Sequence, residues 1–141
     1  MLLNVSYNNP TIKRKIDEEV GPVFSLRERW ALKGIGSPKL FITDASIQIG
    51  NLLILDQNLN TCQIELRPKG IILSFRSLLE TYALIIPYYK LRIYKGDFAV
   101  YSVYKDEYFV KVKSDTKAIQ KFFKKILDYR ADNSPTSIED L

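Results

Sequence analysis

Alternation of apolar and polar residues through the middle of the chain constrains the fold more than any other feature of the sequence. In residues 62–67 the two types exchange at every step, and in residues 108–113 Tyr108 and two valines alternate with Phe109 and two lysines. A period of two places one set of side chains on each face of a strand. We predict five further strands in this region, at residues 47–55, 71–76, 82–86, 91–95 and 98–104.

Short turns separate most of these strands. Turn-forming residues occur at Arg67-Pro68-Lys69-Gly70, Lys95-Gly96-Asp97 and Lys105-Asp106-Glu107. Short connections favour antiparallel neighbours, so the seven strands predict an antiparallel barrel or sandwich. Residues 40–43 could add an eighth, shorter strand. Residues 77–80 fit either an extended hairpin or a loop.

Two short helices are predicted before the strands. Asn9 can cap the first helix, Pro10 suits its first position, and Gly21-Pro22 ends it. The second helix begins at Ser25, and Glu28 follows at the spacing of a capping box. Both helices are too short to be stable alone, so they must pack against something else.

A third helix is predicted over residues 116–129, and it would cap the strands. Its apolar residues recur at the spacing of one helical face: Ile119, Phe122, Phe123, Ile126 and Leu127. The 141 residues suit one domain, which we divide into three parts. Residues 1–37 are a helical extension, 38–130 hold the strands and the last helix, and 131–141 are a flexible tail.

Two short motifs add a resemblance to a known family. Lys69-Gly70-Ile71-Ile72-Leu73 resembles the turn and apolar strand in the middle of pleckstrin-homology-like (PH-like) domains. Ile86-Pro87-Tyr88-Tyr89-Lys90-Leu91 resembles the connection that leads to the next strand. Over about residues 38–130 the chain resembles bacterial members of this superfamily. The resemblance implies an α+β fold, a seven-stranded antiparallel PH-like barrel with a C-terminal capping helix, here preceded by two short N-terminal helices.

The same resemblance implies a binding function, toward lipid head groups, peptides or partner domains. Lipid-binding members carry basic residues on the first two strands and on the loop between them. The corresponding loop here, residues 56–61, contains neither lysine nor arginine. No ligand residue is therefore carried over from the family to this chain.

Composition removes many catalytic chemistries. The chain has no histidine and a single cysteine, Cys62, which lies on an apolar strand face. This excludes histidine bases, histidine metal ligands, internal disulfides and cysteine-rich zinc sites. There is no glycine-rich phosphate loop, and no spacing brings two carboxylates together. We predict no catalytic, cofactor or metal residues and expect no enzyme; an active site in the barrel mouth would need two converging carboxylates.

The net charge of +5 is concentrated in residues 90–125, where ten basic and four acidic residues give +6. Such asymmetry can attract an acidic lipid membrane or a nucleic acid. The candidate binding residues are Lys90, Arg92, Lys95, Lys111 and Lys113. Aromatic residues interleave with them and could stack with bases. The competing interpretation is that these lysines only keep strand and helix faces in water.

Trp30, the only tryptophan, lies one helical turn from Leu26. Tryptophan is enriched among residues that anchor protein interfaces. Alternatively, it packs the helix onto the barrel. The leading hypothesis is a non-catalytic module for protein–protein interaction or assembly, whose partner is an unidentified protein or a second copy. Binding of an anionic surface through the basic residues is the alternative.

No transmembrane segment is predicted, because the longest apolar run, residues 82–89, is far shorter than the roughly 20 residues that span a bilayer. The first residues lack the charge and apolar core of a signal peptide. With a single free cysteine, a cytoplasmic location is expected.

Overall fold

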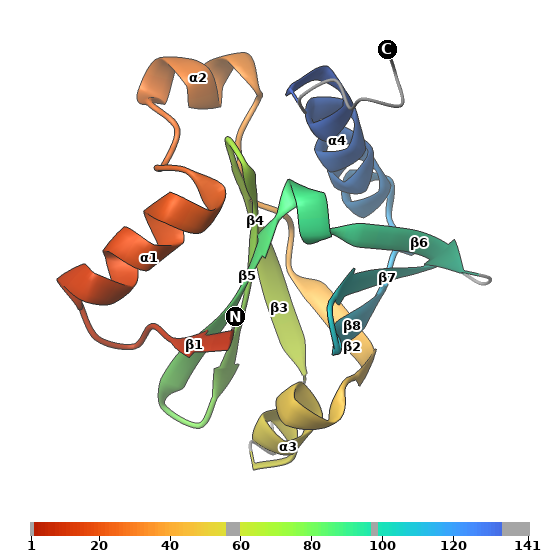
Figure 1. Ribbon diagram of the computed structural model, residues 1–141. Coiled ribbons are helices and arrows are strands. Elements are labelled where there is room, and N and C mark those ends of the chain that lie inside the picture. The colour runs from red at the N-terminus through yellow and green to blue at the C-terminus, as the bar shows by residue number, and fades with distance from the viewer. Residues whose placement is uncertain (1, 56–59, 97–98, 134–141) are drawn as a thin grey trace.

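The computed structural model describes residues 2–55, 60–96 and 99–133 of the chain. It has an α+β fold built on one antiparallel sheet of eight strands (Figure 1). The strands are β1 Leu2–Asn4, β2 Leu40–Ala45, β3 Thr61–Arg67, β4 Gly70–Ser77, β5 Glu80–Pro87, β6 Arg92–Gly96, β7 Val100–Lys105 and β8 Tyr108–Lys113. The helices are α1 Pro10–Val20, α2 Leu26–Ala31, α3 Ile47–Leu55, the 3₁₀ turn η1 Tyr88–Lys90, and α4 Lys117–Asn133.

The sheet consists of two meanders joined along one strand. Its order is β1-β5-β4-β3-β2-β8-β7-β6, so β2 pairs with β3 on one side and with β8 on the other. The strand passes from β3 to β8 between Phe41 and Ile42, and its register with β8 shifts between Ile42 and Asp44. A buried lysine also links the two meanders, because Lys105 Nζ of β7 donates to the carbonyl of Ile85 in β5 at 2.8 Å.

The predicted antiparallel strands are present, but their number and closure differ from the expectation. The sheet is open within the described residues, with β1 and β6 at its edges, so the expected seven-stranded closed barrel is not found. β1 was not predicted; it pairs with β5. Residues 40–43 do belong to a strand, β2. Residues 77–80 form a two-residue hairpin turn between β4 and β5.

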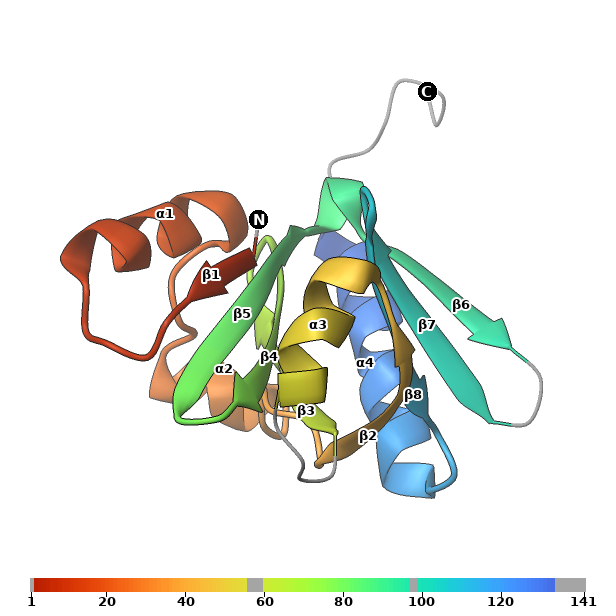
Figure 2. The ribbon, with the colours of Figure 1, turned by 90° about the horizontal axis from the view of Figure 1, so that it is seen from below.

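The strand predicted at residues 47–55 is wrong, because this segment forms helix α3. A short apolar run cannot be assigned to strand or helix by periodicity alone. Ile49 and Leu53, one helical turn apart, are both buried in the main core. The amide of Gly50 donates to the carbonyl of Ser46 at 2.7 Å, and Ser77 Oγ donates to the carbonyl of Leu52. The helix thus closes one end of the core (Figure 2).

Helix α4 fills the concave side of the sheet, between the two meanders (Figure 2). The predicted apolar face is confirmed, since Ile119, Phe122, Phe123 and Ile126 are all buried. Phe123 stacks on Tyr101 of β7 with ring centroids 4.2 Å apart. The helix continues through 133, beyond the predicted end; residues 134–141 of the predicted tail lie outside the described residues.

Helix α1 covers part of the outer face of β4 and β5. The predicted cap is confirmed, because Asn9 Oδ1 accepts from the amide of Thr11 at 2.9 Å. Val20 packs in a second, smaller core with Ile72 and Ile85. None of the helices in the described part of the chain has the length and apolar character needed to cross a bilayer.

Candidate binding surfaces

Helix α2 is capped as the sequence predicts. The amide of Glu28 donates to Ser25 Oγ at 3.2 Å, and the amide of Ser25 donates to Glu28 Oε1 at 3.1 Å. The residue before the cap, Phe24, is buried in the main core. Its ring meets that of Tyr129 in α4 edge to face, 5.6 Å between centroids. The start of α2 is therefore fixed to α4.

The end of α2 is held to the same helix. Lys125 Nζ of α4 donates to the carbonyl of Gly34 at 3.1 Å and to that of Lys33 at 3.4 Å. Partial burial, with a smaller effect of the Lys33 charge, lowers the pKa of Lys125. Both ends of this six-residue helix are thus attached to the body of the protein.

Leu26 and Trp30 project from α2 into solvent. Their side chains are 81% and 86% exposed, and Val23 beside them is also exposed. The interpretation that Trp30 packs the helix onto the sheet is therefore wrong; Phe24 performs that role instead. We call Leu26 and Trp30 the α2 apolar pair.

Three of the five predicted basic residues share the outer face of the β6–β7–β8 meander. Lys111 and Lys113 alternate along β8. Arg92 of β6 pairs with Tyr104 of β7, which pairs with Phe109 of β8, so β7 separates Arg92 from the lysines. Residues on neighbouring strands at paired positions point to the same side, which here is the side away from α4 (Figure 2).

A row of aromatic rings crosses this outer face. Tyr94 meets Tyr104, and Tyr104 meets Phe109, each pair with centroids 5.5 Å apart. Lys111 Nζ lies 5.8 Å from the centre of the Phe109 ring. Tyr94 is 55% exposed and the other two rings are half-buried. These three rings therefore lie on the outer face of the sheet, whereas Tyr101 faces the core.

The other two predicted residues lie elsewhere. Lys90 is in η1 and pairs with Asp106 at 3.5 Å. Lys95 pairs in register with the core-facing Tyr101, which places it on the opposite side of β6 from Arg92, although at the sheet edge it remains exposed. Asp44 lies opposite Lys111 and adds a carboxylate to the basic face. The five residues do not form one site.

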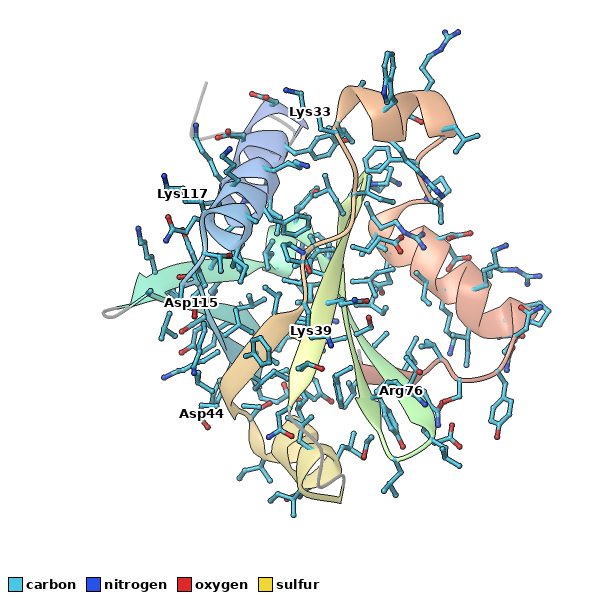
Figure 3. All side chains as sticks on the ribbon, turned by 180° about the vertical axis from the view of Figure 1, so that it is seen from behind. Lys33, Lys39, Asp44, Arg76, Asp115 and Lys117 are labelled. Atoms are coloured by element: carbon cyan, nitrogen blue, oxygen red, sulfur yellow. The ribbon has the colours of Figure 1, made fainter. Side chains whose placement is uncertain are left out.

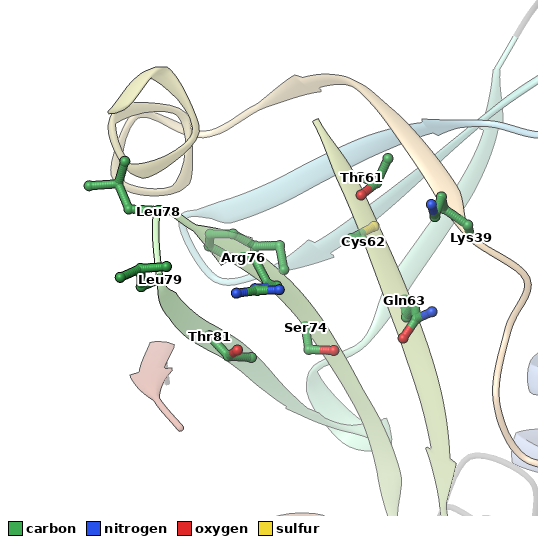
Figure 4. A pocket seen from close by; sticks show the side chains of 10 residues that line it. Lys39, Thr61, Cys62, Gln63, Ser74, Arg76, Leu78, Leu79 and Thr81 are labelled. Carbon is green, nitrogen blue, oxygen red and sulfur yellow. The ribbon is translucent and has the colours of Figure 1, made fainter. Parts of the chain in front are cut away.

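The sequence analysis missed a groove on the outer face of β3, β4 and β5. Figure 3 shows Lys39 and Arg76 on this side of the molecule, and Figure 4 shows the groove itself. Its volume is about 660 Å³. The alternation contained a signal for this groove, because Gln63, Ser74 and Arg76 are the polar residues that alternate with core-facing residues along β3 and β4.

Two observations concern the groups of the described residues that could carry chemistry. Burial raises the pKa of the Cys62 thiol to about 12, so it remains a neutral, buried group. In the residues that the structure covers, no three acidic or cysteine side chains come together to hold a metal ion.

Comparison of the chain with models of protein families, with curated proteins and with solved structures finds no match.

Proposed function

We propose that this chain is a non-catalytic protein-interaction module whose contact surface is the α2 apolar pair. The observation that carries the proposal is an exposed tryptophan on a helix fixed at both ends. Leu26 and Trp30 add little to the stability of the fold, because their side chains remain in water. A partner that covers them would gain the burial of a large ring and an aliphatic side chain.

The rigid attachment of α2 to the rest of the protein contributes to binding as much as its side chains do. Binding is weakened when flexible groups must be ordered, and a surface that is already ordered avoids this penalty. The capping box, the Phe24–Tyr129 contact and the hydrogen bonds from Lys125 hold α2 before any partner arrives. Such rigid aromatic anchors are typical of interface hot spots.

Charges around the pair indicate the partner's chemistry. Arg27 and Lys33 are exposed beside it, while Glu28 is occupied by the capping box. The complementary surface is an apolar pocket with acidic residues at its rim. Such a pocket belongs either to another protein or to a second copy of the chain.

Quantitative affinity capture from the source cells tests the proposal, with wild-type protein, Trp30→Ala and Tyr7→Ala as baits. Tyr7 is 76% exposed and far from α2 in the sequence, so it controls for the loss of any surface ring. We expect proteins retained by wild type and Tyr7→Ala to be lost from Trp30→Ala by about thirtyfold or more. Sedimentation of the purified chain decides whether the partner is a second copy. Equal capture by all three baits, with equal sedimentation, contradicts the proposal.

We further propose that the fold is PH-like. Two antiparallel meanders, β2–β5 and β6–β8, followed by the packed helix α4, agree with the element order that the resemblance implies. In this proposal β1, α1 and α2 are additions before the domain and α3 is an insertion between its first two strands. An experimental structure in which β5 and β6, the outer strands of the two meanders, lie side by side and close the sheet supports this proposal, and a sheet that stays open there contradicts it.

Nucleic-acid binding is a second candidate, which the aromatic row on the outer face favours. Tyr94, Tyr104 and Phe109 offer ring surfaces for stacking, with Arg92 and Lys111 beside them for phosphates. The test is fluorescence anisotropy of a single-stranded RNA of mixed sequence. Lys111→Glu with Lys113→Glu should abolish binding, and the affinity should fall steeply with salt. Binding that the double variant leaves unchanged rejects this candidate.

A further inference from the structure

The groove on the outer face of β3, β4 and β5 combines positive charge with uncommitted hydrogen-bond donors. Lys39 stands on one side and Arg76 on the other, with Thr61, Gln63 and Ser74 between them (Figure 4). Pairing explains the arrangement. Gln63 pairs with Ser74 across β3 and β4, and Arg76 pairs with Thr81 across β4 and β5.

These polar side chains have no partner within the described part of the protein. Lys39, Thr61, Gln63, Ser74, Arg76 and Thr81 make no side-chain hydrogen bond, and neither cation forms an ion pair there. Elsewhere on the same face, Arg67 is fully used by Asp17, Glu65 and the carbonyl of Gly21. The contrast separates a structural arginine from one that is available to a ligand.

Among the described residues that line the groove there is no carboxylate. The nearest acidic residue on β3, Glu65, is paired with Arg67. Glu80, at the start of β5, accepts from Asn4 Nδ2 at 3.3 Å. Two cations therefore face the groove, and no acid in the described part of its lining neutralises them, which favours an anionic occupant.

We propose that this groove is a binding site for a phosphate group. An arginine offers a planar fork of donors and a lysine offers a point charge, a combination suited to an anion with several oxygens. The hydroxyls of Thr61, Ser74 and Thr81 add donors that a tetrahedral anion can use better than a planar carboxylate can. The site lies on β-strands, which fixes the positions of these donors.

The size of the groove implies that the phosphate is attached to a larger group. A volume of about 660 Å³ falls within the range of small-molecule sites. Leu78 and Leu79, at the hairpin turn between β4 and β5, form part of its wall and are largely exposed. Leu78 has a φ of 58°, a backbone conformation that side chains rarely adopt, and it places an apolar side chain at the rim of the groove. The attached group is therefore expected to have an apolar part.

Nuclear magnetic resonance titration with inorganic phosphate, against sodium chloride at equal ionic strength, tests the proposal. We expect saturable shifts of the amides of Ser74, Arg76 and Thr81. Arg76→Gln and Lys39→Gln should each weaken binding about tenfold. Lys117→Gln, which removes one exposed charge from α4, is the matched control and should change nothing. Trp30→Ala should also bind normally, because this site is separate from the α2 apolar pair.

A second arm identifies the source of the phosphate. Sedimentation with phosphatidylcholine vesicles, with and without phosphatidic acid, shows whether the group is a lipid headgroup. Binding that requires phosphatidic acid and is lost in Arg76→Gln assigns a lipid. Saturable phosphate shifts without vesicle binding assign a soluble phosphate compound. Shifts that fail to saturate, or that persist unchanged in both Arg76→Gln and Lys39→Gln, overturn the proposal.

Discussion

Phe24 and Tyr129 meet edge to face, with ring planes at 86° and centroids 5.6 Å apart. The contact joins the residue before the N-cap of α2 to the last turns of α4. Tyr129 also lies 6.1 Å from the ring of Tyr88 in η1. The position of α2, and hence the direction in which Trp30 projects, depends on a buried aromatic contact outside the helix itself.

Replacing Phe24 with alanine should both destabilise the fold and release α2. Loss of a buried phenylalanine side chain lowers the free energy of unfolding by about 3 to 5 kcal/mol. Urea unfolding followed by circular dichroism measures the change. Val23→Ala, at an exposed neighbouring position, should lose less than about 1 kcal/mol. Equal losses in the two variants would show that Phe24 does not anchor α2.

Arg67 should be the most important charged residue for stability. The residue is only 8% exposed. Its side chain pairs with Asp17 and Glu65 and donates a hydrogen bond to the carbonyl of Gly21 at 2.9 Å. Arg67→Met removes all these contacts and detaches α1 from β3. We expect a loss of about 2 kcal/mol, below the range for fully buried pairs because both carboxylates are partly solvated.

Asp17→Asn is the matched control for Arg67, measured in the same unfolding experiment. It weakens one pair with an accessible carboxylate and leaves the other contacts in place, so the loss should stay below about 1 kcal/mol. If Asp17→Asn destabilises the protein as much as Arg67→Met, the pair with Glu65 and the hydrogen bond to Gly21 together add nothing to the pair with Asp17.

Local signals in the sequence predicted much of the secondary structure. Six strands, the two capped N-terminal helices and the apolar face of α4 agree with the structure. Two elements could not be predicted from local pattern. β1 is three residues long and exists only through its pairing with the distant β5. α3 is apolar on most sides, so its periodicity is weak, and its burial against β4 decides its conformation.

The binding surfaces were less predictable, because they depend on which strands become neighbours. The sequence placed Lys111 and Lys113 on one face, but only the strand order shows that Arg92 lies two strands away. The sequence singles out Trp30 as a candidate anchor, but it does not predict that the side chain is exposed. Only the structure shows that Phe24, and not Trp30, is buried in the core. The groove joins Lys39, before β2, to Arg76 of β4, and no single segment contains both.

Cys62 should make stability fall at alkaline pH. Its pKa is raised from 9.0 to about 12 in the fold, by burial. Above pH 9.0 the unfolded thiol ionises while the folded one does not, so the stabilisation present below that pH is lost up to about pH 12. Burial also raises the pKa of Tyr88, which acts in the same direction at higher pH. Urea unfolding across this range should show a decline that is smaller in Cys62→Ala, by up to about 1.4 kcal/mol per pH unit.

Gly70 should tolerate no side chain, because β4 approaches α1 and the end of β5 most closely there. A Cβ at this position would overlap the carbonyl oxygen of Ile86 and lie 2.7 Å from Val20 Cγ1 and 2.8 Å from Pro87 Cα. Two of these atoms are backbone, so the strands would have to separate. We expect Gly70→Ala to lower the free energy of unfolding by about 3 kcal/mol or more in urea unfolding. Gly36→Ala, where a Cβ meets nothing within 4 Å, should stay within about 0.5 kcal/mol of wild type. If the Gly70→Ala protein is as stable as Gly36→Ala, then β4, β5 and α1 are not packed as closely around Gly70 as these distances indicate.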